Sequence, residues 1–150
     1  MDKLERIVVP VDFSPLSKRA LRAACRLARL CRAPVAIHLL HVIPEYEVDR
    51  AFNIRLPDHK EIEQHAERWA GKAFDHYLRG EDLEGLEVVR CVRYGKPARV
   101  ICAYAEEVGA DLIVIASHGR SGFERAVFGS VAEKVLRTGD PPVMVVKGSP

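Results

Sequence analysis

The sequence predicts an α/β fold in three layers, an open parallel sheet of five strands with helices on both faces. Short β-branched, apolar runs alternate along the chain with longer segments whose apolar residues recur at spacings of three and four. Such an alternation places the strands in parallel, because each crossover returns right-handed over the sheet. The 150 residues show no internal repeat and no linker, so one domain over residues 1–150 is expected.

The first part of the chain is expected to form a strand, a helix and a second strand. A strand at about Arg6–Val11 is followed by Ser14 and Pro15, which provide an N-cap and a proline in the first helical position. Pro34 separates the helix from a strand at about Val35–Val42. The helix carries an apolar stripe made of Ala20, Leu21, Ala24, Leu27, Ala28 and Cys31.

The middle of the chain contains the longest irregular stretch, Ile43–Pro57, which is interpreted either as a surface excursion or as a flap near a ligand site. A helix at about Asp58–Leu78 follows it. The apolar face of this helix consists of Ile62, Ala66, Trp69, Ala73, Phe74 and Tyr77. Trp69 is therefore expected in the core.

The second half continues the alternation of strand and helix. Its expected elements are a strand at about Leu86–Val92, a helix at about Pro97–Val108, a strand over Asp111–Ala116, a helix over Ser130–Arg137 and a strand over Val143–Val146. Gly109 is a stop signal for the first of these helices. The run Asp-Leu-Ile-Val-Ile-Ala is typical of a strand buried on both faces of a parallel sheet.

The loop after that strand has the features of an anion site. It bears glycines at 119, 122 and 129 and leads into Ser130-Val-Ala-Glu133, which has the pattern of a capping box. The free N–H groups and the dipole of a helix that begins here favour an anion. Neither a Walker sequence nor a G-x-G-x-x-G is present, so a P-loop and a dinucleotide fingerprint are both excluded.

The glycine spacing that remains resembles the ATP-binding branch of the universal stress protein family. That branch has Gly, two residues, Gly, nine residues and then Gly-Ser or Gly-Thr, and this chain has Ala116, Gly119 and Gly129-Ser130 at the same spacing, with Ala116 in place of the first glycine. Further segments similar to the family are Ile7–Ser14, His38–Val42, Gly95–Pro97, Asp111–Ile115 and Pro142–Val146.

The resemblance implies a Rossmann-like sheet of the adenine nucleotide alpha hydrolase-like type, with strand order 3-2-1-4-5. Ligands of such sheets bind at the carboxyl ends of the strands, where the order reverses. In this order the reversal lies between the first and fourth strands. It would bring Pro10–Asp12 beside Ala116–Gly119, although the two segments are far apart in the sequence.

The resemblance also implies a set of nucleotide-binding residues. They are Pro10, Val11, Asp12, Val42, Ile115, Ala116, Gly119, Arg120, Gly129, Ser130 and Val131. Gly119, Gly129, Ser130 and the Val131 amide would surround the phosphates, and Pro10 and the backbone at Val42 would contact the adenine. Asp12 would bind the ribose hydroxyls or Mg²⁺.

Several of these residues also have an ordinary structural interpretation. Asp12 could cap the first helix, Ser130 could be only a cap of the last one, and Val42 could be a core valine. Arg120 and Arg125 could reach phosphate oxygens or could face solvent. Ala116 would weaken binding about tenfold if its position requires a positive φ or a very close ligand, and would cost almost nothing otherwise.

Two functions follow from the resemblance. The first is a cytoplasmic regulator of stress responses that binds ATP, with Mg²⁺ as a further ligand and hydrolysis at most slow, because nothing in the sequence indicates a strong general base. The second is a nucleotide-free dimeric interaction protein of the same fold. Val143–Val146 is a short apolar edge strand in the implied order, and the family pairs this strand with its copy, so a homodimer is expected.

Other classes of function find little support. No segment is apolar over the roughly 20 residues of a membrane span, no signal-peptide pattern opens the chain, and the net charge of +2 is spread among acids, which argues against membranes and nucleic acid as partners. Ser117-His118-Gly119 only half matches a hydrolase nucleophile elbow. Cys25 and Cys31 are expected as reduced thiols, like Cys91 and Cys102, and the histidines as solvated or satisfied side chains rather than metal ligands.

Overall fold

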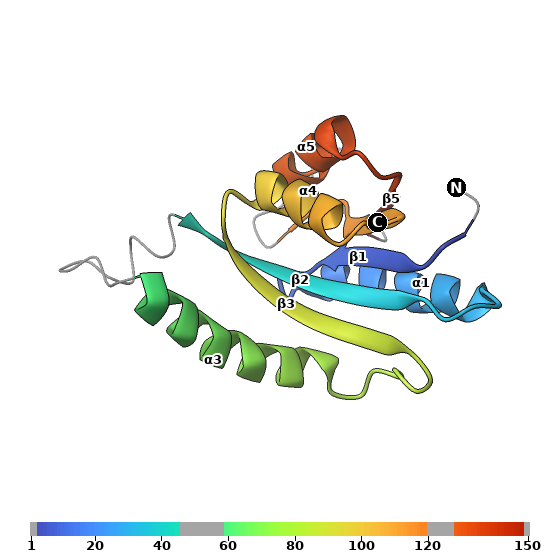
Figure 1. The fold of residues 1–150 in the computed structure, drawn as a ribbon, viewed down its shortest axis with the longest axis horizontal. Coiled ribbons are helices and arrows are strands. Elements are labelled where there is room, and N and C mark those ends of the chain that lie inside the picture. Colours follow the sequence, from blue (N-terminus) through green and yellow to red (C-terminus); the bar gives the residue numbers. More distant parts are fainter. Residues whose placement is uncertain (1–2, 46–58, 120–127, 149–150) are drawn as a thin grey trace.

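The computed structural model describes residues 3–45, 59–119 and 128–148, and it has the architecture that the sequence predicts (Figure 1). Its elements are β1 (Arg6–Pro10), α1 (Pro15–Leu30), β2 (Ala36–Pro44), α3 (His59–Leu78), β3 (Glu87–Gly95), α4 (Pro97–Glu107), β4 (Leu112–Ala116), α5 (Ser130–Thr138) and β5 (Val143–Val146). The strands form one parallel sheet of order β3-β2-β1-β4-β5. The predicted strand order is therefore confirmed.

The sheet separates two hydrophobic clusters. Ile7 and Val9 of β1 pack on the side of α1 and α3, whereas Val8 packs on the side of α4 and α5. This alternation continues in the neighbouring strands, as expected for a sheet covered on both faces. Figure 1 shows α4 and α5 above the sheet and α3 below it.

β2 and β3 are longer at their carboxyl ends than the sequence suggests. They pair without interruption from Ala36 opposite Glu87 to Pro44 opposite Gly95, so β3 includes Arg93 and Tyr94. Both side chains are exposed. β3 lies at the edge of the sheet, where polar and charged side chains can reach water. The sequence pattern therefore does not indicate a strand at its polar carboxyl end.

Trp69 was expected in the core, and this expectation is wrong, because its side chain is 47% exposed. The buried face of α3 is formed by Ala70, Phe74 and Tyr77, at helical spacings of four and three. Trp69 precedes this stripe by one residue and so lies at its margin. One side of the indole still contacts Phe13, with ring centroids 5.9 Å apart.

The histidines of β2 lie on opposite faces of the sheet. His41 is buried and its Nδ1 lies 2.8 Å from the Val11 carbonyl oxygen, whereas Nδ1 of His38 lies 2.9 Å from the Tyr104 hydroxyl. Burial lowers the pKa of His38. All four cysteines are free thiols. In the described part of the chain, no helix is both long and apolar enough to cross a membrane.

Two helix boundaries agree with the expected signals. Ser14 caps α1, with its Oγ accepting the N–H of Ser17 at 3.2 Å. Gly109 follows α4 with a φ of +61°, a conformation that costs other residues about 1–2 kcal/mol.

We therefore expect Gly109→Ala to lower the free energy of unfolding by about 1 kcal/mol. Gly71 lies inside α3, and nothing lies within 4 Å of an added Cβ there. Gly71→Ala should therefore raise the free energy of unfolding by as much as about 1 kcal/mol. Urea denaturation of the two variants checks both signs, and a loss of stability in Gly71→Ala would contradict this account of α3.

Candidate functional site

The order of the sheet reverses between β1 and β4, and these two strands pair only briefly. Their register covers Ile7 opposite Leu112 and Val8 opposite Ile113, whereas β1 pairs with β2 along its whole length. β1 continues to Pro10 and β4 to Ala116, beyond the paired positions. The carboxyl ends of these strands thus form the switch point at which ligands of parallel sheets bind.

Asp12 joins the two sides of this switch point. Its Oδ1 accepts the N–H of Ser14 at 3.0 Å. Its Oδ2 lies 2.9 Å from the position that a Cβ on Gly119 would occupy. Asp12 is therefore not the N-cap of α1, which is Ser14. Any side chain at position 119 would meet this carboxylate, so the glycine permits the close approach of the two loops.

Gly129 returns the chain to the same place. Its N–H donates to the Ser117 carbonyl oxygen at 2.6 Å. A Cβ on Gly129 would lie 3.3 Å from that oxygen and 3.4 Å from the His118 Cα. Its φ of −70° is open to any residue, so glycine is needed for close contact between backbones and not for its conformational freedom.

The expected capping box at the start of α5 is wrong. Gly129 is the N-cap, with an extended ψ of 164°, and no side chain among the described residues caps the helix. Ser130 is the first helical residue, and the carboxylate of Glu133 pairs with Arg137 at 2.7 Å. The hydrogen bond from the Gly129 N–H to the Ser117 carbonyl oxygen holds Gly129 in an extended conformation. The helix therefore begins at Ser130, one residue earlier than the capping-box pattern predicts. The first N–H groups of α5 therefore face the loop, where an anion is favoured.

Ala116 does not strain the backbone. It is the last residue of β4, opposite Val146, and among the described residues Phe13 is the one non-glycine residue with a positive φ. Ala116 packs in the cluster on the α1 and α3 side, whereas its neighbour Ile115 packs on the side of α4 and α5. Its methyl group therefore points away from the side on which α5 begins.

The remaining predicted site residues separate into two groups. Val42, Ile115 and Val131 belong to the cluster on the α4 and α5 side, and Pro10 is buried at the end of β1. Val11 packs on the opposite side of the sheet. The other predicted positions in the loop, among them Arg120, Gly122 and Arg125, lie outside the described residues.

A search against protein families matches residues 3–147 to the model described as "Universal stress protein family". The chain belongs to the universal stress protein family. Universal stress protein MJ0531 of Methanocaldococcus jannaschii is 32% identical over 154 residues, which cover 95% of this chain and 82% of that protein.

Solved structures of the family agree with this universal stress protein in fold. The structure of MJ0577, a protein of M. jannaschii, is 27% identical with a TM-score of 0.80, and the alignment covers 97% of each chain. The universal stress protein of Archaeoglobus fulgidus in complex with dAMP is 26% identical with a TM-score of 0.57, over 98% of this chain and 100% of that chain.

The geometry of Ser117 does not support the hydrolase interpretation. Its side chain is 1% exposed, and its hydroxyl lies 3.0 Å from Nδ1 of the neighbouring His118. Its N–H donates to the Val146 carbonyl oxygen at 2.9 Å, which ties the residue to β5. A nucleophile elbow exposes its serine to substrate, whereas this serine is part of the interior of a universal stress protein.

Proposed function

We propose that this universal stress protein is a single-domain, cytoplasmic regulator that binds an adenine nucleotide between β1 and β4. The observation that carries the proposal is the close approach of the Asp12 carboxylate to Gly119, because it brings two distant segments together at the switch point of the sheet. The dAMP complex of the A. fulgidus family member supports the same class of ligand.

Each part of a nucleotide has a complementary group at this place. The N-terminus of α5 offers the amides of Ser130 and Val131 to the phosphates. The Asp12 carboxylate would accept hydrogen bonds from the ribose hydroxyls or coordinate Mg²⁺ beside the phosphates. Pro10 is the last residue of β1 and pairs with Leu40 on β2, two residues before Val42, so the adenine would lie beside the end of β1 and the adjacent part of β2.

The placement of Ala116 favours nucleotide binding over the nucleotide-free alternative. Its backbone is unstrained, and its methyl group packs on the α1 and α3 side. The alanine in place of the first glycine is therefore expected to cost little nucleotide affinity. A nucleotide would also connect the two halves of the sheet, so that binding stabilises one arrangement of the loop that a partner protein can recognise. The proposed role is binding, with at most slow hydrolysis.

The first test is thermal unfolding of ligand-stripped protein with Mg-ATP, dAMP or Mg-GTP. At a hundred times the dissociation constant, binding adds about 2.7 kcal/mol, which raises the midpoint by about 5–10 °C in a domain of this size. We expect this rise with the adenine nucleotides and a smaller one with GTP. If no nucleotide changes the midpoint, the proposal fails and the dimeric interaction protein becomes the better hypothesis.

A further inference from the structure

The solvent-facing side of α1 is basic along its whole length. Residues 15–34 contain six basic residues and no acidic residue. Spacings of three and four recur among them, which places them along one side of the helix over about 20 Å. Ala20, Ala24 and Ala28 lie on the other side and pack in the core. We call this set the basic stripe, and it consists of Lys18, Arg19, Arg22, Arg26 and Arg29 on α1 and of Arg32 shortly after it.

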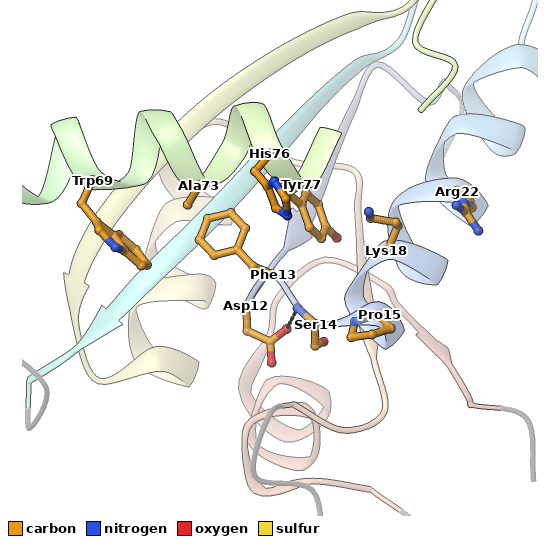
Figure 2. A pocket seen from close by; sticks show the side chains of 10 residues that line it. All are labelled: Asp12, Phe13, Ser14, Pro15, Lys18, Arg22, Trp69, Ala73, His76 and Tyr77. Carbon is orange, nitrogen blue, oxygen red and sulfur yellow. Dashed lines mark hydrogen bonds between the residues drawn. The ribbon is translucent and has the colours of Figure 1, made fainter. Parts of the chain in front are cut away.

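Two acidic residues from the loop after α3 reach the basic stripe. Arg22 donates to both carboxylate oxygens of Glu81, at 2.9 and 2.7 Å, and Lys18 Nζ lies 3.9 Å from the same carboxylate. Arg29 pairs with Asp82 at 3.3 Å. Figure 2 shows Lys18 and Arg22 on α1, beside the pocket that this helix forms with α3. The Glu81 side chain is 10% exposed and that of Arg22 is 58% exposed, so the surface there presents mainly the guanidinium group.

The other end of the stripe keeps its charge without such partners. Arg26 and Arg32 are exposed, and neither forms an ion pair with a residue in the described ranges. Residues 12–34 and 79–86, which include the loops beside α1, contain seven basic and four acidic residues, Asp12 among the latter, and so an excess of three positive charges. The whole chain has a net charge of +2, so the even balance of charge along the chain does not extend to this surface.

The side chains on this face select the class of partner. The cores of protein–protein interfaces are apolar and depleted of charge, but in α1, all of whose residues are described, Leu30 is the one large apolar side chain that is exposed. Helices that bind membrane surfaces bury an apolar face among the lipids, whereas the apolar face of α1 is already packed in the core. Interfaces with nucleic acid are polar and strongly positive, which matches the basic stripe.

We propose that the basic stripe binds the phosphate backbone of double-stranded DNA, without preference for base sequence. Arginine provides five of its six cations, and a guanidinium group can donate two hydrogen bonds to one phosphate. α1 contains no aromatic residue on which the bases of a single strand could stack, which favours a duplex. Phosphate contacts position a protein on DNA but do not read its sequence. This binding does not depend on the proposed nucleotide site, which lies at the carboxyl ends of β1 and β4.

Fluorescence anisotropy of a labelled 20-base-pair DNA duplex measures this binding in the unaltered protein. With an excess of about three charges, we expect a dissociation constant on the order of 10⁻⁵ M at about 20 mM salt. The logarithm of the binding constant should fall with the logarithm of the salt concentration with a slope of about −3, which weakens binding about 40-fold between about 20 and about 80 mM salt. A duplex of unrelated sequence should bind equally well.

The combined change Arg26→Gln and Arg32→Gln removes the two cations of the stripe that have no ion pair. It should weaken duplex binding at least about tenfold and make the salt slope shallower by about one for each residue. Arg99→Gln with Lys134→Gln is the matched control, because it removes the same charge from exposed positions of α4 and α5, on the other side of the sheet. The control should bind the duplex almost as well as the unaltered protein.

Four results would overturn the proposal. They are an equal loss of affinity in both double variants, no change in anisotropy up to about 200 μM protein at about 20 mM salt, tighter binding of the single strand than of the duplex, and tighter binding of phosphatidylglycerol vesicles than of the duplex. The first would indicate a general effect of net charge, and the last a membrane partner. The salt slope and the two binding comparisons need only the unaltered protein, so they remain decisive even if a variant fails to fold.

Discussion

Gly129→Val is expected to weaken adenine-nucleotide binding by about 100-fold, equivalent to about 2.7 kcal/mol. The new Cβ would lie 3.3 Å from the Ser117 carbonyl oxygen and 3.4 Å from the His118 Cα, and both neighbours are backbone atoms that cannot turn aside. The added methyl groups would push the Ser117–Gly119 segment away from α5. That displacement would separate Gly119 from the amides at the start of α5. In the proposed site, Gly119 and these amides contact the phosphates jointly.

Isothermal titration calorimetry measures this loss, and circular dichroism checks that the fold persists. Valine is compatible with the backbone at position 129, whose φ is −70°, so the fold should be retained. Gly129→Ala adds the Cβ alone and should have an intermediate effect. Gly71→Ala, where an added Cβ meets nothing within 4 Å, is the control and should bind normally. Undiminished affinity in Gly129→Val would remove this loop from the site.

The central strands and the switch point could be predicted from the sequence for a physical reason. β1 and β4 are buried on both faces, so their apolar runs have few alternatives, and Ile7 and Ile113 are fully buried. The carboxyl end of β3 was missed because it lies at the edge, where Arg93 remains exposed within a strand. This end of β3 is held in the sheet by pairing with β2, and the local hydrophobic pattern of the sequence carries no information about that pairing.

The errors near the site come from contacts between distant segments. Serine is a favoured N-cap residue, which makes Ser130 a plausible cap from sequence, but the hydrogen bond from Gly129 to Ser117 decides where α5 begins. Trp69 lies beside the buried stripe of Ala70, Phe74 and Tyr77, and the packing of that stripe decides which face of α3 is covered. The positive φ of Phe13 has no local signal at all, because phenylalanine disfavours it and four packed rings enforce it.

The family resemblance predicts a homodimer paired through β5, and Met144→Lys is expected to convert that predicted dimer into monomers and so halve the mass measured by light scattering. β5 ends the strand order, and the Pro142 and Val146 carbonyl oxygens accept hydrogen bonds from Ile113 of β4 and from Ser117, which follows β4. Because the strand alternates with a period of two, the backbone groups of Val143 and Val145 point outward and can pair with a second copy about a two-fold axis. The Met144 side chain is 37% exposed on this strand, where a lysine would oppose its own copy.

Val145→Pro tests the same interface through the backbone. Proline removes the outward N–H of residue 145 but no bond to β4, so the monomer should keep its fold, as edge strands tolerate proline at such positions. Leu30→Lys is the matched control, because it removes an apolar side chain that is 82% exposed at the end of α1. A dimer that survives both changes in β5 would place the interface elsewhere. Monomers in all three variants would indicate a nonspecific effect of surface charge or stability instead of strand pairing.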